Sequence, residues 1–265
     1  MAEPSMAQQK FLKKHRQRHR WIAVIRILLF VLFLILWEAA ARGDLIDAFI
    51  FSSPSRVYHT FTGMLQNGEL FLHVGSTLME TLVSFSLVIL LSLLIAVLLW
   101  LSPMLSRVLE PYLVILNSLP KSALAPLLIV WLGANQRTII VAGMSVAIFG
   151  SILTVYTGFS QVDTEKIKLI KTLHGNRGDV LTKVVLPSSI PIFINTMKVN
   201  IGLCLVGVVI GEFIGSRQGL GYLIIYGSQV FKLDWVIMSI VLLCIMALGL
   251  YSLIQLLERW YLKRI

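Results

Sequence analysis

Six apolar runs of membrane-spanning length alternate with shorter polar segments along the chain. A helix needs about 20 predominantly apolar residues to cross a hydrocarbon core of about 30 Å. The pattern therefore predicts an all-α, polytopic membrane protein with spans at 22–41, 77–101, 111–132, 138–159, 194–215 and 235–257. The third span contains Pro120, Lys121 and Pro126, so we expect a kinked helix that is packed against protein.

A long polar loop, at about 160–191, separates the fourth span from the fifth. One apolar stripe at helical spacing consists of Ile167, Ile170 and Leu173, and a second of Val180, Leu181, Val184 and Val185. Gly175 and Asn176 predict a helix stop between them, and Pro187 with Pro191 predicts the end of the second helix. Two short helices with a bend indicate either a docking segment or interfacial helices whose lysines reach anionic lipid, and periodicity alone favours the latter.

Lysines and arginines are distributed unevenly among the loops. Fifteen fall in the N-terminal tail, the second-to-third connection, the 160–191 loop and the C-terminal end, against five in the alternate loops. The positive-inside rule then predicts that both termini and the 160–191 loop are cytoplasmic. Residues 1–21 form a basic tail, and the apolar run after it is too long for a cleaved signal peptide, so we expect a retained first span.

The composition excludes several classes of function. The chain is 57% hydrophobic and 14% charged, whereas soluble domains have about 25% charged residues. The net charge of +10 reflects the inside bias and lipid contact rather than nucleic-acid binding, because no soluble basic domain carries it. There is no GxxxxGK[ST] loop and no metal-ligand spacing, so we expect neither catalysis nor a cofactor bound by this chain. Cys204 and Cys244 fall within spans and are expected to be packing residues.

Short motifs at and after the C-terminal end of the first span suggest local contacts. Glu38 lies four residues before Arg42, which is the spacing of a helical ion pair. Pro54 is expected to end local helix formation, and a helix on the outer surface is expected to carry Tyr58, Phe61 and Leu65.

Polar residues inside spans are functional candidates by default. Asn117, Lys121 and the carbonyls freed by the prolines are expected to line a pathway, or else Lys121 reaches lipid headgroups or neutralises Glu110. Glu212 must find a donor, either in helix-to-helix hydrogen bonding or in substrate contact. Small residues recur every four positions in the fifth span and predict close helix packing: Gly207, Gly211 and Gly215.

Four ordered elements of the sequence resemble the permease subunits of ABC importers of the nitrate/sulfonate/taurine type. They are SSPSRV at 52–57, PKSALAPL at 120–127, TLHGNRGDVLTKVVLPSSIP at 172–191 and Glu212 followed by GLGYL at 219–223. The third resembles the "EAA" loop, although Lys168-Leu169-Ile170 stands at Glu-Ala-Ala, and His174 stands at the glycine with Gly175 one place late.

The resemblance assigns two sets of site residues. The ATPase-coupling set is Lys168, Lys171, Thr172, Leu173, His174, Gly175, Asn176, Leu186 and Pro187. The pathway or gate set is Asn117, Pro120, Lys121, Pro126, Glu212, Gly219 and Gly221.

The resemblance also implies an assembly and a location. Residues 22–265 would form the transmembrane domain of a homodimer in the plasma membrane, with a solute-binding protein outside. Each 163–191 loop would insert into a groove on a separate ATPase subunit that binds ATP and Mg²⁺. The resemblance allows sulfonates, nitrate-like anions or pyrimidine-type vitamin precursors as cargo.

Two other functions stay open from the residues alone. An ion-coupled secondary carrier would use Lys121 and Glu212, although such carriers usually show internal repeats, and none is visible here. A non-transporting membrane scaffold is the second alternative.

Overall fold

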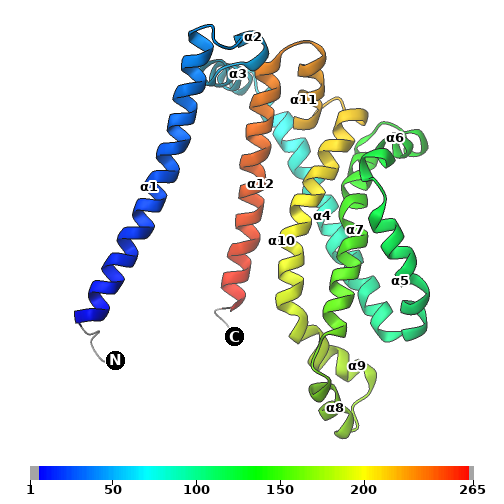
Figure 1. The fold of residues 1–265 in the computed structure, drawn as a ribbon. Coiled ribbons are helices and arrows are strands. Elements are labelled where there is room, and N and C mark those ends of the chain that lie inside the picture. Colours follow the sequence, from blue (N-terminus) through cyan, green and yellow to red (C-terminus); the bar gives the residue numbers. More distant parts are fainter. Residues whose placement is uncertain (1–5, 263–265) are drawn as a thin grey trace.

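The structure, a computed structural model, describes the backbone of residues 6–262 (Figure 1). Side chains are described for residues 17, 18, 21, 22 and 24–261, and the first five residues of the expected basic tail lie outside the described range. Within that range every element is helical: α1 Met6–Arg42, α2 Ala48–Phe51, α3 Pro54–Gln66, α4 Glu69–Leu101, α5 Pro103–Ser118, α6 Lys121–Leu132, α7 Gln136–Ser160, α8 Thr164–Thr172, α9 Arg177–Val180, the π-helical turn η1 Leu181–Val185, α10 Leu186–Gly215, α11 Leu220–Gln229 and α12 Leu233–Leu262. The expected all-α class is confirmed.

The number of spans also agrees with the sequence. Five helical stretches are long and apolar enough to cross a membrane, and the bent pair α5–α6 makes a sixth. The two helices of this pair meet at 96°, around Leu119 and Pro120. Pro120 lacks the N–H that would continue α5, so the expected kink forms there, whereas Pro126 lies inside α6 without interrupting it.

The fifth span differs from the expectation at its start. Pro187 and Pro191 do not end a helix, because α9, η1 and α10 form one helical stretch over Arg177–Gly215. The wider π turn, in which Leu186 N–H donates to Leu181 O, comes directly before Pro187. A π turn shifts the hydrogen-bond register and gives a proline ring room within a continuing helix.

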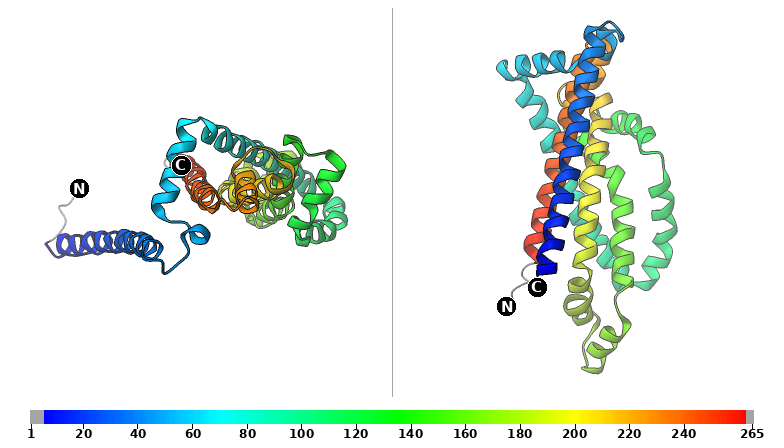
Figure 2. Two further views of the ribbon diagram at one scale, coloured as in Figure 1. Left: turned by 90° about the horizontal axis from the view of Figure 1, so that it is seen from above. Right: turned by 60° about the vertical axis from the view of Figure 1, so that its left-hand side comes forward.

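The core lies where α4, α7 and α10 pack side by side (Figure 2). A Cβ on Gly207 would stand 2.8 Å from Ala142 O and from Gly143 Cα, and one on Gly211 would stand 3.2 Å from Ile139 Cα. The predicted small-residue face therefore lets the backbones of α10 and α7 approach closely. Polar contacts add to this packing, since the Asn200 side chain donates to Ser151 Oγ at 2.7 Å.

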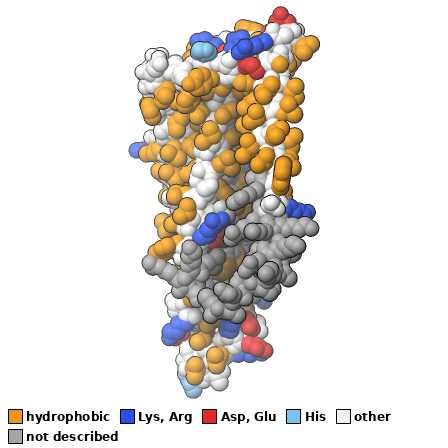
Figure 3. Space-filling model, turned by 90° about the vertical axis from the view of Figure 1, so that its left-hand side faces the viewer, with side chains coloured by type: hydrophobic (Ala, Val, Ile, Leu, Met, Phe, Trp, Pro, Cys, Tyr) orange, Lys and Arg blue, Asp and Glu red, His pale blue; other side chains and the backbone are white. Residues whose placement is uncertain are grey.

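The two ends of the bundle carry different elements. The start of α1 and the end of α12 lie at the end of the bundle that carries α8 and α9. Helices α2, α3 and α11 lie at the opposite end (Figure 1). We call these the α8 end and the α11 end. On the face seen in Figure 3, hydrophobic side chains cover most of the described surface between charged groups at the two ends.

The first span stands to one side of the other helices and contacts chiefly α2 and α3 (Figures 1 and 2). Glu38 accepts from Arg42 Nε at 2.7 Å, as predicted, and also from the Ser55 backbone N–H at 3.0 Å. Pro54 does not end a helix but begins α3, where its missing N–H costs nothing because the first turn has no intrahelical acceptor for it. The α3 helix carries Tyr58, Phe61 and Leu65, as expected.

Candidate functional site

The 160–191 loop forms the two expected short helices, α8 and α9, joined by a tight turn. Leu173 caps α8, and the next residue, His174, has φ 60°. His174 N–H donates to Lys171 O at 3.0 Å, and Gly175 N–H donates to Ile170 O at 2.9 Å. These two bonds and the left-handed residue form a Schellman motif. The left-handed position is thus occupied by His174, where the importer pattern has glycine, and not by Gly175.

Gly175 is required for a different reason, which is space. A Cβ at this position would stand 2.5 Å from Ile170 Cγ2 and 2.9 Å from Ile170 O. Such contacts are closer than real Cβ atoms show, so any side chain here forces α8 away from the turn. The residue after it, Asn176, caps α9 through a reciprocal pair of hydrogen bonds with Asp179.

The inner faces of these helices pack against the end of the bundle. Ile167 and Ile170 lie against a buried cluster that contains the whole second stripe, namely Val180, Leu181, Val184 and Val185. Arg177 also donates to Leu101 O at the end of α4. Because of these contacts the loop is fixed to the bundle at its base.

The predicted first stripe is wrong at Leu173. This side chain is 71% exposed, because the chain leaves the helix at that residue, and Leu169, four residues earlier, is 61% exposed. The two leucines form an exposed apolar pair at the far end of the loop. The exposed polar residues of the predicted coupling set lie on the same segment: Lys168, Lys171, Thr172, His174 and Asn176.

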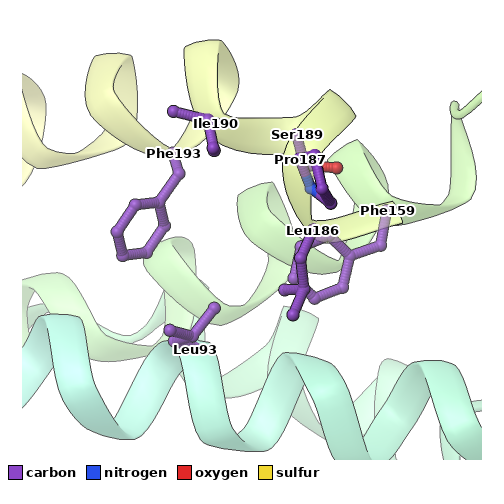
Figure 4. Close-up of a pocket in the computed structure, with 7 residues that line it drawn as sticks. All are labelled: Leu93, Phe159, Leu186, Pro187, Ser189, Ile190 and Phe193. Atoms are coloured by element: carbon purple, nitrogen blue, oxygen red, sulfur yellow. The ribbon is translucent and has the colours of Figure 1, made fainter. Parts of the chain in front are cut away.

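Leu186 and Pro187, the last two residues of that set, lie elsewhere. They line an apolar pocket of about 290 Å³ between the start of α10 and helices α4 and α7 (Figure 4). Leu93 and Phe159 form its other walls, and Ser189 places a buried oxygen without a hydrogen-bond partner beside it. These residues belong to the base of the loop rather than to its tip.

At the break in the third span, the Lys121 side chain donates hydrogen bonds to backbone carbonyls. Its Nζ donates to Leu116 O at 2.6 Å and to Asn117 O at 2.9 Å, and lies 5.7 Å from the centre of the Phe149 ring. Leu116 O has lost its helical donor because Pro120 has no N–H. The freed carbonyls predicted from the sequence thus exist, and Lys121 bonds them rather than neutralising Glu110.

The polar cluster at the α11 end is buried and consists of side chains of α4 and α10 and the first backbone N–H groups of α11. Glu212 is 0% exposed, and it accepts from Thr77 Oγ1 and from the Gly221 N–H, both at 2.6 Å. Thr77 Oγ1 accepts in turn from the Leu220 N–H at 2.8 Å, and His73 Nδ1 accepts from the Gly219 N–H at 3.0 Å. Side chains of α4 and α10 therefore satisfy the free N–H groups that begin α11.

The two glycines of this motif are required by close approach. Gly219 has φ 113°, and a Cβ there would overlap the Glu212 carboxyl group. A Cβ on Gly221 would stand 2.7 Å from Glu212 Oε2. His73, Thr77 and Glu80 of this cluster are absent from the predicted site. Glu80 carried a signal, since an ionisable residue inside a span is a candidate by default.

A family model decides what these elements belong to. Residues 88–265 match the binding-protein-dependent transport system inner membrane component. The chain is a member of this family. It is 31% identical, over 92% of its length and 97% of the relative's, to a probable ABC transporter permease protein of Haemophilus influenzae. It is 26% identical, over 95% of its length and 90% of the relative's, to the putative aliphatic sulfonates transport permease protein SsuC of Bacillus subtilis.

Solved structures agree with the fold. The permease chain superposes on a chain of an amino acid ABC transporter with a TM-score of 0.61, at 20% identity, and the match covers 75% of this chain and 97% of the other. The protein is thus an ABC transporter permease with the fold of importer membrane subunits. Neither the secondary carrier nor the scaffold finds support in these comparisons.

In this permease the predicted site residues fall into separate places. The loop tip directly precedes the helical stretch Arg177–Gly215, and the pocket at the base of the loop and the cluster of Glu212, Gly219 and Gly221 follow along this stretch and α11. Asn117, Pro120 and Lys121 lie instead at the α5–α6 break. Asn117, Pro120 and Pro126 are exposed, and Glu212 is buried. The predicted gate set is therefore two groups with different surroundings.

Proposed function

We propose that this permease couples to a separate ATPase subunit through the tip of its 163–191 loop. The observation that carries the proposal is the exposed pair of Leu169 and Leu173, 61% and 71% exposed at the end of a loop whose base is fixed in the core. Exposed apolar side chains ringed by polar residues are typical of protein interfaces. The ATP and Mg²⁺ would bind to the ATPase subunit.

The helical stretch Arg177–Gly215 supports a mechanical role. Its 39 residues correspond to about 58 Å of helix, which joins the loop at one end to the Glu212 cluster at the other. A displacement of α8 and α9 by the ATPase would move this helix as a body, and with it the contacts that hold α11. We infer a rigid-body transition that is biased by the partner's nucleotide state.

The proposed arrangement in the membrane follows from the charges. The α8 end carries most of the basic residues of the loops, so we infer that it lies in the cytoplasm, with both termini, and that the α11 end faces outward across the plasma membrane. Two copies of the chain would enclose the solute pathway, with the exposed α5–α6 break beside it. A solute-binding protein would deliver the cargo at the α11 end.

The relatives support a class of cargo but not a compound. One relative is named for aliphatic sulfonates, and a sulfonate is an anion. We propose that the cargo is a small organic or inorganic anion of this kind or a pyrimidine-type precursor. Uptake assays with candidate solutes and the cognate binding protein test this directly.

Charge substitution at the loop tip tests the coupling. Leu173→Asp should abolish co-purification of the ATPase and its stimulated hydrolysis, without changing the thermal unfolding of the permease, because the side chain is exposed. Leu45→Asp is the matched control, since Leu45 is 81% exposed in the connection between α1 and α2. Full ATPase binding by a folded Leu173→Asp variant would refute the docking role.

A further inference from the structure

Two buried carboxyl groups face each other at the α11 end. Glu80 of α4 is 1% exposed and Glu212 of α10 is 0% exposed. Thr77, one helical turn before Glu80 on α4, donates to Glu212 Oε1 at 2.6 Å, which places Glu80 beside the Glu212 carboxyl group. Two neighbouring carboxylates repel each other, and both would lose their hydration. Since the alternative is two unshielded charges, a buried pair of this kind holds a proton.

The hydrogen bonds decide which member is charged. Glu212 accepts from Thr77 Oγ1 and from the Gly221 N–H, which is the bonding of a carboxylate. It also lies at the start of α11, where the helix dipole favours a negative charge. Glu80 Oε2, by contrast, is buried without any partner. A neutral carboxylic acid at Glu80, donating its proton toward Glu212, fits both observations.

The surroundings offer no other neutralising charge. Among the described residues, no lysine or arginine forms an ion pair with either glutamate. From α7 come the Gln136 amide, which donates to Met79 Sδ at 3.3 Å, and Arg137, which is exposed. From α11 come backbone N–H groups and the Tyr222 ring, which stacks on His73. His73, near Glu69, accepts from Gly219 at Nδ1, so it carries no proton there and is neutral.

We propose that Glu80 and Glu212 form a proton-binding site, with the proton on Glu80, and that this proton holds α11 on α4 and α10. Deprotonation of Glu80 would place a second negative charge beside Glu212. The repulsion would separate the carboxyl groups and pull Glu212 from the N–H of Gly221. The α11 helix would then lose its cap. The inference depends on the packing of the α11 end and not on the proposed ATPase contact.

Infrared spectroscopy of the full chain in lipid nanodiscs locates the proton. Near neutral pH the wild type should show the carbonyl-stretch band of a buried protonated carboxyl group, and Glu80→Gln should remove it. Glu80 and Glu212 are the only buried carboxyl groups among the described residues, so the assignment is direct. No such band in the wild type, or a band that persists in Glu80→Gln, would overturn the proposal.

Hydrogen–deuterium exchange tests the effect on α11. Glu80→Gln retains a donor toward Glu212, so the α11 amides should stay protected from exchange. Glu212→Gln should raise the exchange rate of these amides about tenfold or more, which is the effect of losing a hydrogen bond to a charged group. Raising the pH should accelerate wild-type α11 exchange relative to α7, the internal reference, but not that of Glu80→Gln. An equal pH response in both proteins would contradict the proposal.

A wild-type titration keeps the test independent of the variants. The infrared band and the protection of α11 should be lost together with rising pH, with one midpoint. Loss of the band without any change in α11 exchange would show that the proton does not hold the helix.

Discussion

The loop tip and the Glu212 cluster lie at opposite ends of one helical stretch, and they are stabilised in opposite ways. At the tip, α8 and α9 are held by local backbone caps, and Leu169 and Leu173 stay exposed. At the other end, Glu212, Thr77 and His73 bond the start of α11 from distant parts of the sequence, and Glu212 is completely buried. A segment with local caps folds without a partner and leaves its surface exposed. A buried cluster from three helices instead responds to any relative movement of those helices.

Removing Glu212 should have the largest effect. Glu212→Ala leaves the N–H of Gly221 without its acceptor and removes the shorter of the two hydrogen bonds of the Thr77 hydroxyl, at a cost of about 3 kcal/mol or more. Thermal unfolding and exchange of α11 measure the loss. Glu110→Ala, at an exposed position, is the control and should change neither. Unchanged α11 protection in Glu212→Ala would remove the distinction between the two ends.

The helix that joins the two regions should be sensitive to added volume. Gly207→Ala places a Cβ against Ala142 O and Gly143 Cα at 2.8 Å, so α10 and α7 must separate, at a cost of about 1 to 3 kcal/mol. Gly202→Ala, on the same helix with no atom within 4 Å, should be neutral or stabilising by up to about 1 kcal/mol. Chemical unfolding in detergent compares them, and equal effects would show that α10 is not closely packed at Gly207.

Gly175→Pro should act on the loop alone. It removes the N–H that bonds Ile170 O and adds a ring where even a Cβ stands 2.5 Å from Ile170 Cγ2, a local cost of about 1 to 3 kcal/mol. Stimulated ATP hydrolysis should fall while the spans unfold as in the wild type. Coupled hydrolysis that is retained in a folded Gly175→Pro variant would count against the docking role.

His174→Gly should have the smallest effect, with the opposite sign. The left-handed conformation at φ 60° costs a residue with a Cβ about 1 kcal/mol, and glycine removes this strain. Exchange of the α8 amides should slow about fivefold with ATPase coupling retained. Faster exchange would show that the His174 side chain stabilises the turn.

Apolar run length predicted the spans well, because the requirement of the hydrocarbon core is visible in composition. The break at Pro120 was also predictable, since a missing N–H is a local property. The effect of Pro187 and Pro191 was not, because the π turn that accommodates Pro187 depends on how Leu181 and Val185 pack in the core. Local chemistry therefore locates a break, and packing decides whether a helix continues through it.

The candidate site was predicted unevenly for the same reason. The turn at 174–176 is marked in the sequence, but the exchange of roles between His174 and Gly175 depends on the contact with Ile170. Glu212 was a candidate, whereas His73 and Thr77, whose sequence gives no signal, join it only through the packing of α4 against α10 and α11. A local sequence pattern cannot predict contacts between residues that are 135 or more positions apart.

Thiol labelling of the loop tip tests the central claim most directly. In a Leu173→Cys variant with Cys204 and Cys244 replaced by alanine, a membrane-impermeant maleimide should label inside-out vesicles, and bound ATPase subunit should block the label. Labelling from the outer side of the membrane, or labelling that the ATPase leaves unchanged, would contradict the account.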